Sequence, residues 1–145
     1  MKKNEQFNFH LSLPCRSITE TRQFYEQELG FKIGRRQGYI WFDVDIFGNQ
    51  LTFTHDDAFS LTIKSYNFED STLPTFHFGV IVDKNIWQEL YKNYENKDYF
   101  AIGSIYFLKD KKGQHQSFFL KDPNGYFIEF KAFFNESEVF EINWK

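Results

Sequence analysis

The chain has 145 residues, a formal net charge of -3 and one cysteine, Cys15. These values indicate one domain of ordinary size or two small halves, and they argue against a nucleic-acid surface, an internal disulfide and a cysteine-built zinc site. No apolar run approaches the roughly 20 residues that span a bilayer, and no secretory signal is recognisable. We therefore expect a cytoplasmic protein that binds neither nucleic acid nor membrane.

The first part of the chain predicts a β-α-β-β-β unit over about residues 7–55. Residues 7–14 alternate between apolar and polar side chains, which is the period of a half-buried strand, and His10 falls on the face opposite the apolar one. Residues 17–20 have the spacing of a helix capping box, and Gly30 stands where that helix is expected to end. Three strand-like segments follow, at residues 31–35, 39–44 and 50–54.

The same pattern restarts after a polar linker at about residues 56–74, in which a short strand is expected near 61–64. The second unit covers about residues 75–134. It opens on another alternating segment at residues 76–82. A helix is expected over residues 85–97, with Asn85 as its cap and apolar side chains at four-residue steps. Three further strands are expected at residues 100–108, 116–120 and 126–133.

The repeated unit predicts one α+β domain, in which two tandem β-α-β-β-β modules form a curved mixed sheet around a metal cleft. Residues 135–145 form a tail in which Phe140, Ile142 and Trp144 alternate with polar residues. This tail is expected to add an edge strand or to cover a partner's surface, so a homodimer is one expectation. Phenylalanine occurs 20 times; we interpret this content as a large core, with an aromatic-lined pocket as the alternative.

Three residues in this pattern carry metal-binding chemistry. Each unit opens on a Phe-His pair, which contributes His10 and His77, and the last strand contributes Glu129. Two imidazoles and one carboxylate are the ligands of a facial metal triad with open positions. A carboxylate among apolar neighbours also needs a cation or a strong donor. A metal meets that need for Glu129, and Lys131 offers an ordinary ion pair instead.

The two units, the histidines on their first strands and the Asp-Pro-Asn-Gly turn at residues 122–125 resemble the vicinal oxygen chelate superfamily. This group includes glyoxalases, extradiol dioxygenases and fosfomycin or bleomycin resistance proteins. The resemblance covers about residues 7–134. It implies two modules forming a cup around a divalent metal, with His10, His77 and Glu129 as ligands. The implied substrate chelates the metal through adjacent oxygens.

The branch of the superfamily is less sharply indicated. Gln50 stands where glyoxalase I-like lyases are expected to supply a carboxylate ligand, and an amide is no general base. Extradiol dioxygenases use the bare triad with Fe(II), although the tyrosine of their motif is here Phe119. We favour a dioxygenase-type oxidoreductase with Fe(II) or Mn(II), with Zn or Ni as other metals. The alternatives are a glyoxalase-like lyase or isomerase, and a non-catalytic protein that binds an aromatic compound or antibiotic.

Further catalytic roles are predicted for three side chains. Gln50 is expected to hold a metal-bound water or the substrate. His55 or His115 is expected to be the acid-base group, because histidine titrates near neutral pH; the alternative for both is a loop-end histidine without a catalytic role. The partner is a small molecule whose identity the residues do not indicate.

Overall fold

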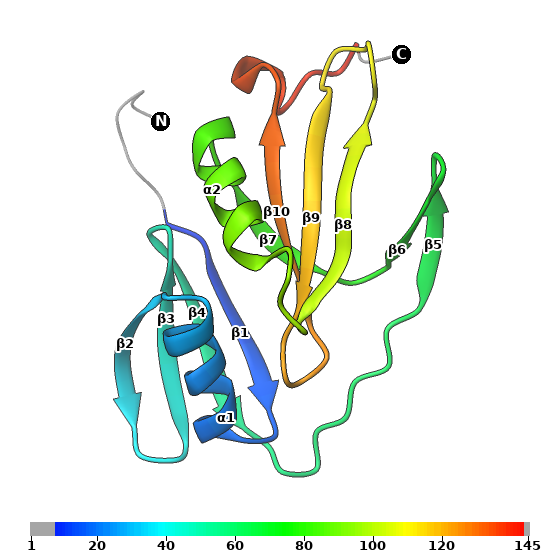
Figure 1. Cartoon of the computed structure of the whole chain (residues 1–145). Coiled ribbons are helices and arrows are strands. Elements are labelled where there is room, and N and C mark those ends of the chain that lie inside the picture. Colours follow the sequence, from blue (N-terminus) through cyan, green and yellow to red (C-terminus); the bar gives the residue numbers. More distant parts are fainter. Residues whose placement is uncertain (1–7, 144–145) are drawn as a thin grey trace. The chain divides into compact units, whose positions relative to one another are not determined.

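The computed structural model describes residues 8–143 and divides into two compact units between Leu61 and Thr62. Each unit contains one open four-stranded mixed sheet with a helix on one face (Figure 1). The predicted α+β class and the two tandem β-α-β-β-β modules are therefore confirmed. No helix within the described part of the chain has the length and apolar character that a membrane crossing requires.

The first unit, unit 1, has strand order β1-β4-β3-β2, in which β1 and β4 are parallel and the other pairs are antiparallel. Its helix continues from α1 into a π-helical turn, η1, and ends before Gly30, whose φ of 74° suits a residue without a side chain. The elements are β1 (His10–Cys15), α1 (Ile18–Gln23), η1 (Phe24–Glu28), β2 (Lys32–Gln37), β3 (Trp41–Ile46) and β4 (Asn49–His55).

Local sequence explains most of unit 1. The Ser17 side chain accepts a hydrogen bond from the backbone N–H of Glu20 at 3.2 Å, so the predicted cap at the helix N-terminus forms. Along β1, Leu13 and Cys15 are buried whereas His10 is exposed. The predicted strand alternation is therefore present, and His10 lies away from the apolar core. Residue 7 of that predicted strand lies outside the described residues.

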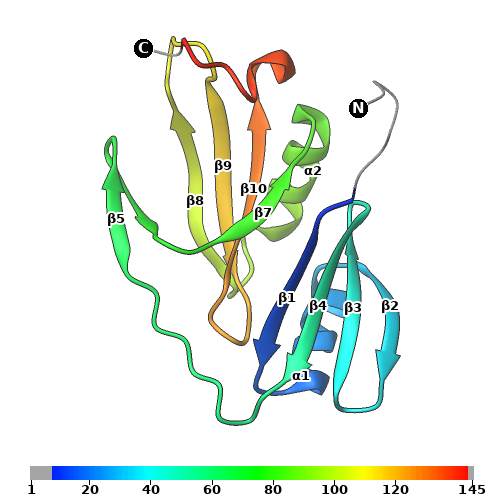
Figure 2. The same ribbon diagram turned by 180° about the vertical axis from the view of Figure 1, so that it is seen from behind.

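The second unit, unit 2, has strand order β7-β10-β9-β8, with β7 parallel to β10. A separate two-stranded hairpin, β5–β6, precedes this sheet and is visible from behind in Figure 2. The elements are β5 (Ser65–Phe68), β6 (Ser71–Pro74), β7 (Phe78–Ile81), α2 (Lys84–Tyr94), β8 (Phe100–Phe107), β9 (His115–Lys121), β10 (Phe127–Phe133) and the 3-10 turn η2 (Glu136–Glu138).

Two local predictions for unit 2 are wrong, and of the two alternatives for the tail the edge strand does not form in the described residues. Helix α2 is capped by Asp83 and not by Asn85, because the Asp83 carboxylate accepts from two backbone N–H groups of the first turn at 2.8 and 3.0 Å. The strand expected near residues 61–64 begins instead at Ser65. Residues 135–143 form no edge strand, because the Asn135 side chain accepts from the N–H of Ser137 and begins η2. Trp144 of the predicted tail strand lies outside the described residues.

The two faces of strand β9 have different partners. Phe118 faces α2, where its ring lies 5.3 Å from that of Trp87, and it also lies 5.1 Å from the ring of Phe130 on the neighbouring strand β10. The Trp87 indole N–H donates to the Phe130 carbonyl. The neighbouring residue, Phe119, packs with Leu73 of the hairpin. Much of the aromatic content therefore builds the core beneath α2, as interpreted from composition. The opposite face of this sheet carries the candidate site.

Candidate functional site

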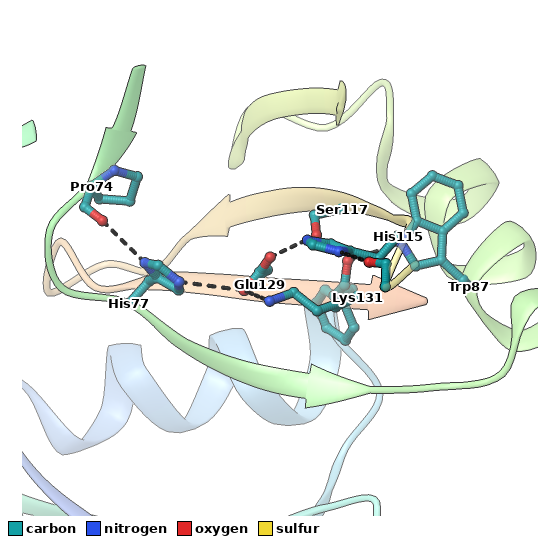
Figure 3. Close-up of polar contacts among 9 residues, drawn as sticks. Pro74, His77, Trp87, His115, Ser117, Glu129 and Lys131 are labelled. Atoms are coloured by element: carbon teal, nitrogen blue, oxygen red, sulfur yellow. Dashed lines mark hydrogen bonds and ion pairs between the residues drawn. The ribbon is translucent and has the colours of Figure 1, made fainter. Parts of the chain in front are cut away.

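Glu129 is the centre of a buried polar cluster in unit 2 (Figure 3). Its side chain comes from β10, and the residue is 8% exposed. Oε2 of Glu129 lies 3.3 Å from Nε2 of His77 and 3.4 Å from Nζ of Lys131. Oε1 accepts a 2.6 Å hydrogen bond from the hydroxyl of Ser117, which is fully buried. The burial of this carboxylate is thus compensated by three donors.

The pairing of β7 with β10 brings His77 to this carboxylate. Gly79 pairs with Glu129 across the two parallel strands, and His77 lies two residues before Gly79. A Cβ atom at position 79 would overlap the backbone of Glu129, with the carbonyl carbon only 2.7 Å away. The absence of a side chain at Gly79 therefore permits the close approach of β7, which begins at the residue after His77.

The ring of His77 is oriented by a backbone carbonyl. Its Nδ1 lies 3.0 Å from the carbonyl oxygen of Pro74. A carbonyl only accepts hydrogen bonds, so Nδ1 carries a proton, and Nε2 is the nitrogen that faces Glu129. Histidines that ligate metals characteristically donate their other ring N–H to such an oxygen. His77 is therefore arranged as a metal-ligating histidine would be.

The pKa values of the pair are shifted in opposite directions. Burial raises the pKa of the Glu129 carboxyl, but contacts with His77, Lys131 and Ser117 outweigh that effect and hold the pKa below its usual value. The hydrogen bond to Glu129 raises the pKa of His77 against the opposing effect of burial. Both shifts favour the charged forms of the two groups, and therefore an ion pair between them in the metal-free protein.

The donor set at this position fits a metal ion in part. His77 contributes one nitrogen and Glu129 one oxygen, at a separation of 3.3 Å. Within residues 8–143 no group of three His, Cys, Asp or Glu side chains is arranged around a common point. The third predicted ligand, His10, lies in unit 1, exposed on β1 and paired with Gln50 of β4. Its role stays a prediction.

His115 lies in the same pocket as the Glu129 cluster. This pocket has a volume of about 210 Å³, and His77, His115, Glu129 and Lys131 form its polar lining. Nδ1 of His115 is 2.8 Å from the carbonyl of Gly113, so Nε2 is free to accept a proton. Burial lowers the pKa of His115. A neutral imidazole near pH 7 has the protonation state of a general base.

Unit 1 holds a second buried carboxylate, Asp43, that the sequence analysis missed. Its residue is 5% exposed. Oδ2 accepts from Nε2 of Gln50 and from Nε of Arg35, both at 3.0 Å, and Oδ1 accepts from the hydroxyl of Thr52 at 2.6 Å. Burial raises the pKa of Asp43, but these hydrogen bonds outweigh it and lower the pKa. The signal in the sequence was an acidic residue within the apolar run at residues 41–44.

The strand register identifies the residue of unit 1 that corresponds to Glu129. Glu129 pairs with Gly79, which lies two positions after His77. Ser12, which lies two positions after His10, pairs with Thr52, whereas His10 itself pairs with Gln50. Thr52, and not Gln50, is thus the counterpart of Glu129. The Gln50 amide N–H donates to Asp43, which directs its oxygen away from that carboxylate.

His55 is not near the other predicted groups of unit 1. It ends β4 and is exposed, five residues beyond Gln50. Five residues of extended strand span about 17 Å, and an odd separation places the two side chains on opposite faces. Of the two histidines predicted as acid-base groups, His115 is therefore the one with support from its surroundings.

Comparison with known proteins identifies the family of this chain. A family model described as the Glyoxalase/Bleomycin resistance protein/Dioxygenase superfamily matches residues 9–130. The chain belongs to this superfamily. The resemblance predicted from the Phe-His pairs and the Asp-Pro-Asn-Gly turn is confirmed. Divalent metals are common in the superfamily, although no particular metal is indicated for this member. No curated protein matches the chain significantly.

Solved structures place this superfamily member among glyoxalase-type folds. A glyoxalase/bleomycin resistance protein/dioxygenase from Alicyclobacillus acidocaldarius has 28% identity and a TM-score of 0.79, covering 96% of this chain and 100% of the other. A lactoylglutathione lyase from Agrobacterium tumefaciens has 14% identity and a TM-score of 0.58, covering 90% and 96%. A virulence protein from Salmonella typhimurium has 17% identity and a TM-score of 0.59, covering 88% and 96%. The last two likenesses concern the fold alone.

Proposed function

We propose that this protein is a metal-dependent enzyme acting on a small substrate that chelates the metal through adjacent oxygens. The observation that carries the proposal is the His77–Glu129 pair. The imidazole is oriented by the Pro74 carbonyl, and its Nε2 faces a buried carboxylate at the wall of a pocket. His77 and Glu129 are the proposed ligands in unit 2, and His10 is the proposed ligand in unit 1.

The residues of the chain have distinct roles in this proposal. A divalent metal bound there would supply Lewis-acid or redox chemistry to the chelating substrate. Ser117 holds one carboxylate oxygen of Glu129, so the other oxygen is directed at His77. Lys131 neutralises the Glu129 charge in the metal-free protein. His115 is the proposed proton acceptor, because its pKa is lowered and because the Gly113 carbonyl contacts Nδ1 and not Nε2.

We favour an oxygenase-type oxidoreductase with Fe(II) or Mn(II) over a lyase or isomerase with Zn or Ni. A lyase of the glyoxalase type requires a carboxylate in the first module that moves protons. The counterpart of Glu129 there is Thr52, and the carboxylate bonded to Gln50 is Asp43. Asp43 already accepts three hydrogen bonds and has a lowered pKa, so it is a poor base.

A non-catalytic binding protein is the second candidate function. Two observations favour it: Lys131 already neutralises Glu129, and the pocket also has aromatic walls, including Phe107 and Phe119. In this alternative the histidine and carboxylate form a permanent ion pair, and the pocket retains its ligand by apolar contact and one charge.

The test is the metal content of protein purified anaerobically without a histidine tag. Glu129→Gln removes the charge at nearly constant volume, and Glu89→Gln, an exposed position on α2, is the matched control. We expect near-stoichiometric iron or manganese in the wild type and in the control, and loss in Glu129→Gln. Zinc or nickel would favour the lyase or isomerase. Metal-free protein after reconstitution would contradict the metalloenzyme and favour the binding protein.

A further inference from the structure

We propose that the pocket of unit 2 takes a one-ring aromatic compound carrying an ionised oxygen, with Phe68 determining the preference for a flat ring and Lys131 the preference for the charge. This inference deepens the proposed function and rests on it for the identity of the reacting substrate. The binding itself depends only on side chains of unit 2, so it is testable without metal.

The apolar walls of the pocket come from two elements. Phe68 and Leu73 belong to the β5–β6 hairpin, and Phe107 and Phe119 belong to the sheet. The rings of Phe68 and Phe107 are 5.5 Å apart, and Leu73, Phe107 and Phe119 are nearly fully buried. Aromatic rings pack favourably against one another in offset or edge arrangements at such distances. These walls favour a flat ring over a puckered one.

The volume of the pocket matches a ligand with one ring. The pocket measures about 210 Å³. A dry apolar cavity of about 150 Å³ is enough to bind benzene. The pocket therefore has room for one ring with one or two small substituents.

The polar end of the pocket selects the charge of the ligand. Lys131 has three N–H donors, and the 3.4 Å contact with Glu129 uses one of them. Its side chain is 26% exposed and lines the pocket. A carboxylate or phenolate oxygen on the ring is the group that this end would bind.

The hairpin is attached to the sheet at its turn. The Glu69 carboxylate accepts from the backbone N–H of Leu108 at 3.2 and 3.4 Å, just beyond the end of β8. This contact holds Phe68, the residue before Glu69, beside Phe107. Phe68 is thus a specificity-determining residue that the hairpin, and not the four-stranded sheet, supplies.

The experiment compares three small probes on metal-free protein kept in a chelator, by ligand-detected NMR titration. Benzoate has the ring and the charge, benzamide has the ring without the charge, and cyclohexanecarboxylate has the charge without the flat ring. We expect benzoate to bind about tenfold more tightly than benzamide, because a charge-assisted hydrogen bond is lost in the amide. We expect it to bind about fivefold more tightly than cyclohexanecarboxylate.

Three variants assign these preferences to residues. Lys131→Met is expected to abolish the preference for benzoate over benzamide, and Phe68→Ala the preference over cyclohexanecarboxylate. Tyr106 is an exposed aromatic residue of β8 that does not line the pocket, so the control variant Tyr106→Ala is expected to keep both preferences. Phe68→Leu replaces Phe68→Ala if circular dichroism shows that the alanine variant does not fold.

Three outcomes would each overturn this inference. They are equal affinity for the three probes, no binding of any probe at millimolar concentration, and preferences that are unchanged in Lys131→Met and Phe68→Ala. Because the titration contains no metal, its failure is distinct from that of the proposed metalloenzyme, which the metal content of Glu129→Gln tests separately.

Discussion

At the scale of single residues, the chemistry proposed for this protein depends on the contacts that surround Glu129. Its carboxylate is buried, yet the hydroxyl of Ser117, the imidazole of His77 and the ammonium of Lys131 surround it. Each contact favours the ionised form, and together they outweigh the cost of burial. An ionised carboxylate is the form that ligates a metal, so the cluster keeps Glu129 in the form that its proposed role requires.

The first prediction concerns Ser117. Replacing it with alanine leaves Oε1 of Glu129 without its buried donor. A hydrogen bond to a charged group contributes about 2 kcal/mol, so Ser117→Ala is expected to lower the free energy of unfolding by about that amount. Ser104→Ala, at an exposed position of β8, is the control and should change stability by less than about 0.5 kcal/mol. Equal effects of the two substitutions in urea unfolding would contradict the role given to Ser117.

The second prediction concerns pH. The pKa of His77 is raised above 6.5 in the folded protein, so its contribution is fully present below pH 6.5 and is lost as pH rises through the raised value. The pKa of Glu129 is lowered below 4.5, so its contribution is present above pH 4.5 and is lost as pH falls through the lowered value. The ion pair is therefore most stabilising between these two limits.

The measurement is the unfolding free energy of metal-free wild type and His77→Gln at about pH 6 and about pH 9. The variant is expected to lose more stability at the lower pH. The lowered pKa of His115 has the opposite effect, because it destabilises the fold as pH falls below 6.5. His115 is present in both proteins, so its effect cancels in the difference. A difference that is the same at both pH values would show that His77 is not charged in this pair.

At the scale of elements, the close pairing of β7 with β10 makes the site. Gly79 lies against the backbone of Glu129, where any side chain would overlap it. We predict that Gly79→Ala destabilises the protein by about 3 kcal/mol, because two strands have to move apart. The same change should lower metal content, because it displaces His77 relative to Glu129.

Gly103→Ala is the matched control for this prediction. Gly103 also lies within a strand, β8, but a Cβ atom there meets nothing closer than 4.0 Å. Alanine in a strand interior is more favourable than glycine by about 0.5–1 kcal/mol, so the control should be neutral or slightly stabilised. Thermal denaturation of both variants measures the contrast. A folded Gly79→Ala protein with wild-type stability would contradict the close approach.

At the scale of the whole molecule, the two units provide different parts of the proposed ligand set. His77 and Glu129 belong to unit 2 and His10 to unit 1. A ligand that binds only the folded state stabilises it by about 2.7 kcal/mol at a concentration one hundred times its Kd. For a chain of this length, that corresponds to a rise in Tm of about 8 °C.

We therefore predict that Fe(II) or Mn(II), added anaerobically, raises the Tm of the wild type by several degrees and raises that of His10→Gln much less. His55→Gln, which also replaces an exposed histidine of unit 1, is the control and should behave as the wild type. Calorimetry on the three proteins measures the shifts. An equal rise in His10→Gln would remove His10 from the ligand set and confine the metal to unit 2.

The parts of the fold that were predictable from sequence are those with a local cause. Alternation along residues 7–14 placed His10 opposite the apolar face, and the cap at Ser17 followed from spacing alone. The hairpin β5–β6 was not predictable, because its residues are mostly polar and its apolar members, such as Leu73, are buried only by contact with Phe119 of β9. Asp43 was missed for the same reason: its three donors come from β2 and β4.

The sequence by itself determined the repeated unit, the faces of its strands and the superfamily, because strand alternation, helix caps and the turn at residues 122–125 depend on neighbours in the chain. Only the tertiary structure decided which polar groups meet. The register of β7 on β10 joined His77 to Glu129, and the register of β3 on β4 joined Asp43 to Thr52. Strand register depends on contacts between distant segments, and a shift of one residue would turn every one of these side chains to the other face.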